Sequence, residues 1–293
     1  MKLKGICYMI ASSMFFSLSA VLVKLVSDSF NSYFISVTRF IIGVILGLAV
    51  LLFSKKAFRV SDKKAWVIRG VAGSVSMILF YLAIEKTGSA RATLMNNLYV
   101  IFVALLGFLL NKERMKLVNM ISMMLCLMGV TIIFYDGGKY SLAGDIIGVF
   151  SGLIMGIAIH YTKRSSEKEH PAIVYMSACI FGLVFAPFSS VNQLKPGLLQ
   201  FLLLLAIGGS SFLAQWLMTS SYSRISAIKG SLVSYLKIPF TVVIGILFGD
   251  RVSTKFYIGT AILIVGLLTE SGIFQVLFSQ NKKLIRSQLT KSI

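Results

Sequence analysis

Residues 89–130 read SARATLMNNLYVIFVALLGFLLNKERMKLVNMISMMLCLMGV, and residues 226–267 read SAIKGSLVSYLKIPFTVVIGILFGDRVSTKFYIGTAILIVGL. The two stretches align from end to end without a gap, and the matching positions are Ser89 with Ser226, Ala90 with Ala227, Glu113 with Asp250, Arg114 with Arg251 and Gly129 with Gly266. Earlier in each half, a slightly longer constant spacing pairs Gly5 with Gly144, Ser12 with Ser151, Lys24 with Lys163 and Gly43 with Gly182. The chain therefore contains an internal repeat that covers most of its length.

The composition of the chain is that of a membrane protein. Of its 293 residues 57% are hydrophobic and 13% are charged, with a mean hydropathy of +0.86, whereas soluble domains carry about 25% charged residues. A spanning helix needs about 20 mostly apolar residues, and ten stretches fit: 5–26, 33–53, 66–85, 91–110, 117–135, 144–162, 171–191, 197–219, 228–249 and 255–275. The first is longer than the apolar region of a signal peptide and nine more follow, so we expect it to remain as the first helix.

The number of stretches in each half predicts the architecture. Five is odd, so the second half must enter the membrane from the side opposite to the first. The sequence therefore predicts an all-α membrane protein with ten transmembrane helices in a 5+5 inverted repeat: a first repeat over 1–135, a second over 144–275 and a basic cytoplasmic tail over 276–293. Inverted repeats are typical of secondary transporters. A channel or a membrane enzyme remains an alternative.

The formal net charge of +19 would favour a nucleic-acid partner in a soluble protein, but here the cations lie mainly in the connections. One side of the predicted membrane carries 19 Lys and Arg residues and the other carries 7. By the positive-inside rule both termini are cytoplasmic, and we expect the plasma membrane as the location. The expected partners are the lipid bilayer and a small-molecule solute, not nucleic acid. Three cations lie within helices, and one of them, Arg69, is predicted to be an interface anchor near the start of 66–85.

The sequence lacks the common enzyme motifs. It contains no GxxxxGK[ST] phosphate loop, no GxGxxG fingerprint and no HExxH zinc motif. The cysteines Cys7, Cys126 and Cys179 are far apart in apolar stretches, so we expect buried packing residues rather than a disulfide or metal site. The prediction is a protein that is not an enzyme and has no cofactor.

The layout resembles the EamA-like branch of the drug/metabolite transporter superfamily. The resemblance covers essentially the whole chain and rests on the ten-helix arrangement and on the closing signature of each half, which reads Ala90…Glu113…Gly129 and Ala227…Pro239…Asp250…Gly266. It implies solute transport without ATP hydrolysis, and a central cavity lined by the third, fourth, eighth and ninth helices. One difference is Phe102, which stands where the second half has Pro239 and leaves open whether the fourth helix is kinked.

A polar stripe runs along the ninth predicted helix. Its members recur at steps of four and three residues, and they are Gly230, Ser234, Lys237, Thr241 and Gly245. Lipid cannot satisfy such a face, so it meets either protein or a water-filled cavity. Lys237 lies near the helix centre, where a charge costs at least about 2.5–3.5 kcal/mol on insertion scales, and Pro239 frees the carbonyl of Tyr235 at the same depth. We expect Lys237 to contact substrate or a coupling ion; a structural ion pair or a neutral lysine is the alternative.

Other helices add amide, hydroxyl, aromatic and guanidinium groups, which suit a polar organic solute of modest size. The predicted substrate-binding residues are Lys237, Ser234, Tyr235, Thr241, Asn97, Asn96, Tyr99, Tyr81, Gln215, Trp216 and Arg39. Packing roles remain open for Tyr99 and Trp216. Arg39 has two alternative roles, which are to extend outward to the interface or to pair with Glu85.

These features favour a secondary active transporter that moves an amino acid or another zwitterionic or anionic solute by alternating access. The alternative is a proton-coupled exporter of drugs or organic cations, whose small multidrug relatives rely on an acidic residue in the first helix; residues 5–26 contain no Asp or Glu. A lipid-directed enzyme or flippase would need a polar groove open to the bilayer. Small-residue spacings indicate close helix approach within the bundle or a homodimer face, and they are Gly43–Gly47, Gly148–Gly152–Gly156 and Gly245–Gly249.

Overall fold

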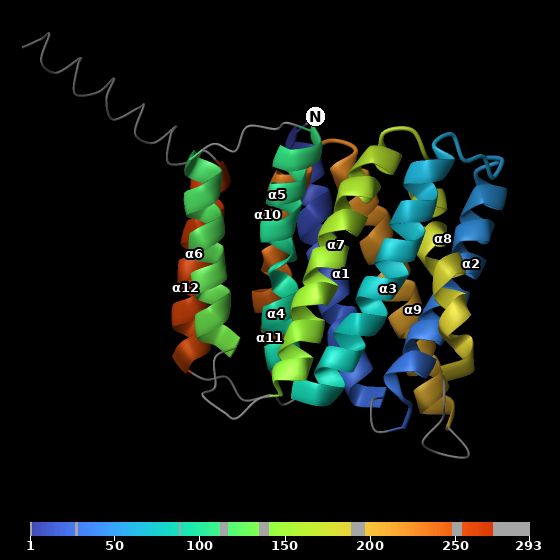
Figure 1. Ribbon diagram of the computed structural model, residues 1–293. Coiled ribbons are helices and arrows are strands. Elements are labelled where there is room, and N and C mark those ends of the chain that lie inside the picture. Colours follow the sequence, from blue (N-terminus) through green and yellow to red (C-terminus); the bar gives the residue numbers. More distant parts are fainter. Residues whose placement is uncertain are drawn as a thin grey trace, which may run out of the picture.

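The computed structural model describes residues 2–26, 29–87, 89–111, 117–134, 141–188, 197–247 and 254–271. These residues form a bundle of α-helices (Figure 1). In chain order they are α1 (Lys2–Val26), α2 (Ser32–Phe53), α3 (Lys63–Thr87), α4 (Ser89–Asn97), α5 (Tyr99–Asn111), α6 (Leu117–Phe134), α7 (Leu142–Ser166), α8 (Pro171–Gly182), α9 (Leu198–Tyr222), α10 (Ala227–Val233), α11 (Lys237–Leu247) and α12 (Thr254–Ser271). Short 3-10 helices follow α8 (Leu183–Phe188) and α10 (Ser234–Leu236). The predicted tail over 276–293 and the acidic residues of the closing signatures, Glu113 and Asp250, lie outside the described residues.

Eight helical segments in the described part of the chain are long and apolar enough to cross a membrane. They are Leu3–Val26, Ser32–Phe53, Lys63–Ala83, Ala92–Leu109, Leu142–Ser166, Pro171–Phe188, Leu198–Tyr222 and Ala227–Leu247. Two further apolar helices, Leu117–Ile133 and Thr254–Thr269, are shorter than the roughly 20 residues that a span needs. The predicted all-helical membrane architecture is confirmed, and eight of the ten predicted spans have the required length.

The connections at one end of the bundle bind each other. The Glu169 carboxylate, between α7 and α8, accepts hydrogen bonds from the backbone N–H groups of Ser61 and Asp62, between α2 and α3. The Asp62 carboxylate also pairs with Arg164 Nε at 2.9 Å. Two of the most basic connections therefore lie together, at the same end as the N-terminus (Figure 1).

Glycines allow the helices of the bundle to approach closely. A Cβ on Gly43 of α2 would lie 2.6 Å from the sulfur of Cys179 in α8. On α7, a Cβ on Gly152 would lie 2.9 Å from the Asn96 carbonyl oxygen, and one on Gly156 would lie 2.8 Å from a side chain of α5. These two predicted small-residue spacings are therefore contacts within the bundle.

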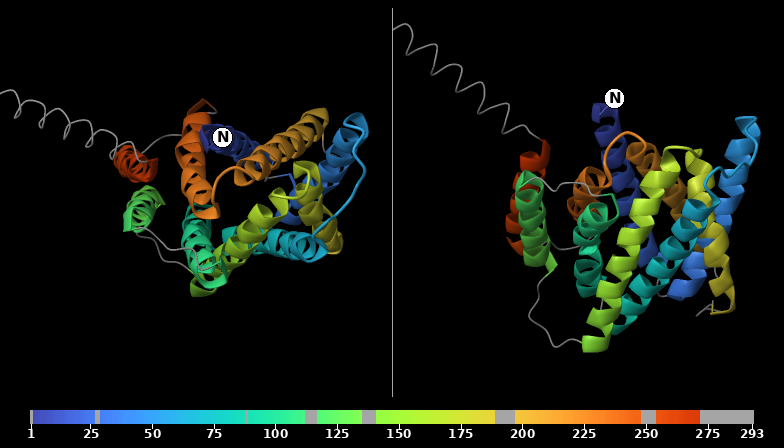
Figure 2. Two further views of the ribbon diagram at one scale, coloured as in Figure 1. Left: turned by 90° about the horizontal axis from the view of Figure 1, so that it is seen from above. Right: turned by 45° about the horizontal axis from the view of Figure 1, so that its top comes forward.

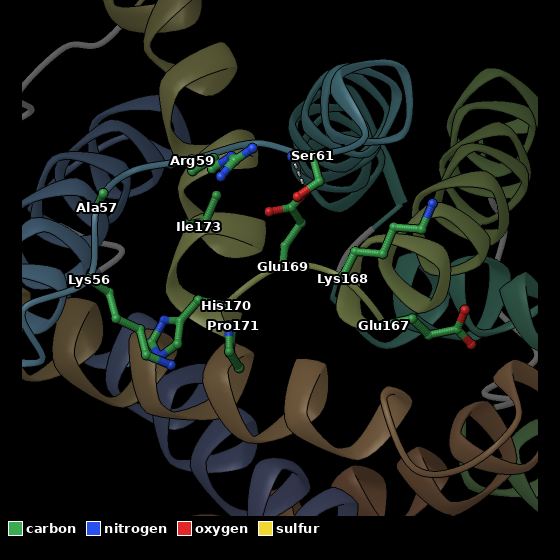
Figure 3. A pocket seen from close by; sticks show the side chains of 10 residues that line it. All are labelled: Lys56, Ala57, Arg59, Ser61, Glu167, Lys168, Glu169, His170, Pro171 and Ile173. Carbon is green, nitrogen blue, oxygen red and sulfur yellow. Dashed lines mark hydrogen bonds between the residues drawn. The ribbon is translucent and has the colours of Figure 1, made fainter.

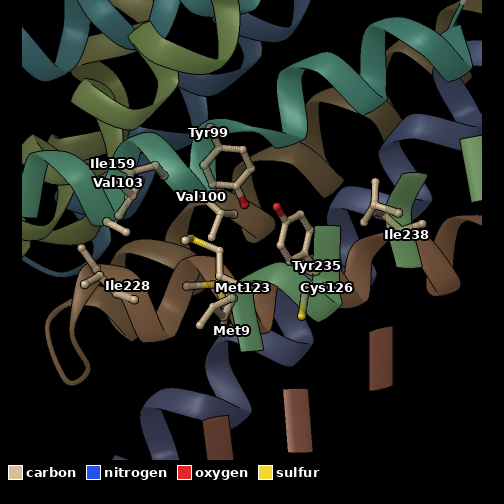
Figure 4. Close-up of a cluster of buried hydrophobic side chains, with 14 of the residues drawn as sticks. Met9, Tyr99, Val100, Val103, Met123, Cys126, Ile159, Ile228, Tyr235 and Ile238 are labelled. Atoms are coloured by element: carbon tan, nitrogen blue, oxygen red, sulfur yellow. The ribbon is translucent and has the colours of Figure 1, made fainter. Parts of the chain in front are cut away.

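The pair α6 and α12 stands at the edge of the bundle (Figures 1 and 2). A Cβ on Gly129 would lie 2.5 Å from the Gly259 carbonyl oxygen, and Ser122 Oγ donates to the Gly266 carbonyl at 2.6 Å. The buried side chains of this pair join a hydrophobic cluster with residues of α1, α4, α5, α7 and α9 to α11 (Figure 4). The pair is thereby packed on the helices that carry the predicted site.

The three cysteines have different environments. Cys126 and Cys179 are buried, as predicted, but Cys7 is exposed on α1. The prediction for Cys7 was wrong because an apolar stretch indicates that a helix lies in the membrane, and does not indicate which face meets lipid. A thiol is apolar enough for either environment.

Two helical segments are interrupted at corresponding places. In the first half α4 ends at Asn97 and α5 begins at Tyr99, and in the second half the 3-10 helix Ser234–Leu236 separates α10 from α11. The residues at the centres of the breaks, Leu98 and Tyr235, occupy the same position in the alignment that pairs Ser89 with Ser226. The breaks are therefore equivalent in the two copies of the repeat.

The break in the first half forms without a proline. Ile101 donates its backbone N–H to the Leu98 carbonyl at 2.9 Å, a 3-10 type of bond, and the Asn97 carbonyl accepts the Tyr235 hydroxyl at 2.8 Å. A backbone acceptor buried in a membrane needs such a partner. The helix is therefore interrupted at Leu98 although no proline stands there, and the Tyr235 hydroxyl from the second half satisfies the Asn97 carbonyl.

Candidate functional site

Lys237 begins α11, directly after the second break. Its Nζ lies 5.0 Å from the centre of the Tyr99 ring, within the range of a cation–π contact. Its carbonyl accepts from Ser17 Oγ and Thr241 Oγ1, each at 2.7 Å. The side chain is half-buried, and no carboxylate in the described ranges pairs with it. An ammonium at this depth still needs a compensating anion.

Two buried tyrosines surround this lysine. The hydroxyl of Tyr99 shares a hydrogen bond with the hydroxyl of Ser234, and the Tyr235 hydroxyl donates to the Asn97 carbonyl. The two rings are tilted with their centres 6.5 Å apart, and their hydroxyls point toward the same region (Figure 4). The two breaks thus bring polar groups from both halves of the chain beside Lys237.

Asn96 and Asn97 are neighbours with different surroundings. Asn96 donates to Ser151 Oγ at 2.6 Å, and Ser151 in turn donates to the Ser76 carbonyl at 3.0 Å, so Asn96 connects α4 to α7 and α3. Asn97 is fully buried, and neither its amide nitrogen nor its amide oxygen has a hydrogen-bond partner among the described residues. Buried amides are nearly always satisfied, so Asn97 is the better candidate for a contact with solute.

A second group of predicted residues lies between α2, α3, α8 and α9. Arg39 is an electrostatic neighbour of Tyr81 and of Tyr175. Gln215 accepts a hydrogen bond from Arg69 Nη2 at 3.2 Å. Beside Gln215 on α9, the Trp216 ring packs against aromatic rings of α9 and of the connection before α8, with centres 5.8 and 5.0 Å apart.

Arg69 is the residue that the sequence placed wrongly. It was predicted to anchor the interface, but only 4% of its surface is exposed and it lies inside the bundle. Its Nη1 would lie 2.0 Å from a Cβ on Gly73, one turn further along α3, so the guanidinium folds back over that glycine. The same spacing joins Arg39 to Gly43 on α2. The glycine one turn after Arg69 is the sequence signal that could have indicated an inward guanidinium.

The predicted residues therefore form two groups. The lysine group is Lys237, Ser234, Tyr235, Thr241, Asn97 and Tyr99. The arginine group is Arg39, Tyr81, Gln215 and Trp216, to which the structure adds Arg69. Asn96 belongs to neither, because its amide contacts α7. The predicted pairing of Arg39 with Glu85 concerns a side chain outside the described part.

A surface cavity of about 570 Å³ lies at the end of the bundle where the basic connections meet (Figure 3), and His170, whose ring packs on Trp216 of the arginine group, is part of its lining. Its charged lining is Lys56, Arg59, Glu167, Lys168, Glu169 and His170. Partial burial lowers the pKa of His170, and the nearby Lys56 lowers it further. Glu169 accepts hydrogen bonds from the backbone of the facing connection, so the cavity lies where the two connections meet.

The fold and these two groups define a class. Polar and cationic side chains lie between the spanning helices, and those of the lysine group lie at breaks in two helices. This is the organisation of membrane transporters. The model of the EamA-like transporter family matches residues 3–135 and 142–270, so the chain belongs to that family. Transmembrane transport and a membrane location follow from this membership.

Individual relatives agree with the family. An uncharacterized transporter of Helicobacter pylori strain J99 is 26% identical over 280 residues, which cover 90% of this chain and 93% of that protein. The pseudopaline exporter CntI of Pseudomonas aeruginosa is 26% identical over 265 residues, with 89% and 93% covered. Solute carrier family 35 member G1 of Mus musculus is 24% identical over 291 residues, with 89% and 76% covered.

The fold also matches a solved structure, described only as "Crystal structure of protein". That chain superposes with a TM-score of 0.78 at 15% identity and covers 92% of this chain and 97% of its own length. The likeness supports the helical arrangement, and the relatives indicate transport of small solutes.

Proposed function

We propose that the chain is a secondary active transporter that carries a small anionic or zwitterionic metabolite by alternating access. One observation carries this proposal. Three cations, Arg39, Arg69 and Lys237, lie within spanning helices, and the described carboxylates lie near helix ends or in connections: Asp62, Asp145, Glu167 and Glu169. A solute with an anionic group provides the compensation that the described protein groups do not.

The same charges disfavour the alternative of a proton-coupled exporter of organic cations. A cationic substrate would enter a region that already holds uncompensated positive charge. Such exporters usually couple transport to the release of a proton from an acidic residue. The described interior of this protein has a lysine and two arginines instead. The anionic or zwitterionic solute therefore remains the proposal.

The mechanism that we propose uses ten spans in a 5+5 inverted repeat, with repeats over 1–135 and 144–275. The eight long segments provide eight spans, and α6 and α12 provide the fifth and tenth. The packing of the helices supports this arrangement. In the proposed repeat, α1 corresponds to α7, α3 to α9, and α5 to α11. Accordingly, α1 packs against α9 as α7 packs against α3, and α1 packs against α11 as α7 packs against α5. The two breaks at equivalent repeat positions are the discontinuous helices expected beside a midplane site.

We place both termini in the cytoplasm and the protein in the plasma membrane. The positive-inside rule supports this orientation, since the basic connections around Lys56 and Arg164 meet at the end that holds the N-terminus. A homodimer through the Gly245–Gly249 spacing remains a prediction, because Gly249 lies outside the described residues.

Within the lysine group, Lys237 binds the anionic group of the solute. Tyr99 and Ser234 provide hydroxyls next to it, and Asn97 provides an amide that no described protein group engages. Tyr235 and Thr241 act mainly through the backbone at the breaks, since their hydroxyls bind the carbonyls of Asn97 and Lys237.

The test is transport by the purified full-length protein in proteoliposomes. A panel of radiolabelled amino acids, organic acids, nucleosides and cationic dyes is offered, with each gradient of proton and sodium imposed in turn. We expect saturable uptake of at least one acid or amino acid and no transport of the dyes. Transport of the dyes alone, driven by a proton gradient, would establish the cation exporter instead.

A further inference from the structure

The arginine group contains two like charges close together. Arg39 of α2 and Arg69 of α3 are electrostatic neighbours, and both face Tyr175 and Cys179 of α8. The geometry explains the approach. A Cβ on Gly43, one turn beyond Arg39, would lie 2.9 Å from the Tyr175 ring, so this face of α2 is pressed against α8. The arginine group therefore holds two like charges, one on α2 and one on α3.

The Nε atoms of Arg39 and Arg69 are buried and have no partner in the described chain. The neighbouring Tyr175 hydroxyl is a neutral acceptor and carries no charge to compensate them. Arg69 Nη2 donates to the Gln215 side-chain oxygen at 3.2 Å, and that acceptor is neutral. A cluster of unpaired donors with net positive charge is complementary to a group with several anionic oxygens.

Glu85, whose side chain lies outside the described residues, is far along α3 from Arg69. Arg69 and Glu85 lie sixteen residues apart on α3. At about 1.5 Å of rise per residue, their Cα atoms are about 24 Å apart along the helix. Among the residues whose side chains the structure describes, no carboxylate pairs with Arg69.

Tyr222 of α9 belongs to the same buried cluster as Tyr99 of the lysine group. It is an electrostatic neighbour of both Arg69 and Tyr99, and the Tyr99 ring carries the Lys237 ammonium on its face. Tyr222 is thus a common neighbour of the two cationic groups.

We propose that Arg39 and Arg69, together with Gln215, form a second anion-binding site, so that the transported solute is one that carries two separate acidic groups, carboxylate or phosphate. The planar guanidinium groups bind the two oxygens of one acidic group, which a compact ammonium does not. Lys237 binds the second acidic group of the solute. This inference rests on the proposed transport function and names the substrate class.

The experiment compares matched solutes that differ by one acidic group. The pairs are glutamate with glutamine, succinate with its monoamide, and phosphoserine with serine, measured as initial uptake rates in proteoliposomes. We expect the wild type to show a KM at least tenfold lower for the doubly acidic member of at least one pair. The phosphoserine pair distinguishes phosphate from carboxylate. Equal or weaker affinity for the doubly acidic member in every transported pair overturns the inference, and so does transport of none of the six.

Two variants locate the second site. Arg69→Met should raise the KM for the doubly acidic solute at least tenfold and leave that for its singly acidic partner within twofold. Arg59→Met, at an exposed arginine of the connection between α2 and α3, is the matched control and should change neither value. Unchanged selectivity in Arg69→Met overturns the inference.

Gln215→Glu keeps the test valid if Arg69→Met fails to fold. This nearly isosteric change places a carboxylate where the amide oxygen already accepts from Arg69 Nη2, and it gives the guanidinium an internal partner. We expect a folded protein that has lost its preference for the doubly acidic solute. If Arg69 is purely structural, the variant folds and its selectivity is unchanged. That result overturns the inference. It leaves the proposed function intact, because a singly acidic solute is still transported. Chloride-dependent uptake that disappears in Arg69→Met also overturns it, because the site then holds a coupling anion.

Discussion

At the scale of single residues, Asn96 and Asn97 provide a matched pair. A buried amide without a hydrogen-bond partner costs about 1–3 kcal/mol of stability. Asn97→Leu removes such an amide, so we expect unchanged or higher thermal stability. We also expect a large loss of solute affinity. Asn96→Leu removes the partner of Ser151, so we expect stability to fall by about 1–3 kcal/mol. Thermal unfolding in detergent and uptake by proteoliposomes measure both effects. Loss of stability with normal transport in Asn97→Leu would show that this amide is structural.

Sequence patterns identified some residues of the candidate site and missed others. The stripe on the ninth predicted helix led to Lys237 and Ser234 because a polar residue inside an apolar helix is itself a strong signal. Arg69 was misplaced because its position near a helix end suggested the interface, and position alone does not fix the direction of a long side chain. Whether these residues bind solute stays a prediction for the experiments above.

At the scale of helices and connections, the break in the first half depends on a hydrogen bond from the second half. Tyr235→Phe removes the hydroxyl that satisfies the Asn97 carbonyl. We expect the free energy of unfolding to fall by about 1–3 kcal/mol, because the acceptor stays buried. Tyr257→Phe, at a tyrosine that is 63% exposed, is the control and should leave stability unchanged. Equal stability of the two variants would mean that the break is stabilised by packing alone.

The connection between α2 and α3 gives a pH-dependent prediction. The N–H of Ala65 donates to Asp62 at 3.0 Å and Arg164 pairs with it, and together these lower the pKa of the Asp62 carboxyl. A lowered pKa contributes stability above the pKa of the unfolded chain, about 3.9 for Asp, and that contribution is lost as the pH falls through the folded value. Asp62→Asn should therefore show a smaller loss of thermal stability than the wild type between about pH 5 and pH 3. Identical pH profiles would contradict this role for Asp62.

The positions of helices were easier to predict than their interruptions. Apolar length alone identified the spans, because lipid requires long apolar helices. The break at Leu98 was left open because no proline marks it; it depends on the Tyr235 hydroxyl and on the close approach of Gly152. Such tertiary contacts join residues that are distant in the sequence.

At the scale of the whole molecule, the orientation can be tested directly. A reporter that is active only in the cytoplasm should work when fused at residue 1 or after residue 293, since both ends are proposed to be cytoplasmic. The same reporter should be silent when inserted in the connection 136–143. Activity there would mean that the number of spans or the orientation is wrong, and the inverted repeat would be wrong with it.

The 5+5 inverted repeat stays a prediction, and several structural features occur at paired positions of the sequence repeat. The breaks at Leu98 and Tyr235 and the contacts of Gly129 and Gly266 between α6 and α12 occur at positions that the repeat pairs. The direction of transport depends on the gradients across the membrane, because alternating access runs either way.

The most direct test of the central claim is the initial rate of solute uptake by Lys237→Met in proteoliposomes. The solute is the acid or amino acid that the wild type transports best, and the protein is quantified after reconstitution. Lys64→Met, at an exposed lysine of α3, is the matched control. The account predicts that Lys237→Met inserts normally and loses at least 90% of the uptake rate, roughly the tenfold effect of 1.4 kcal/mol, while Lys64→Met keeps it. Normal uptake by Lys237→Met would contradict the claim that this lysine binds the solute.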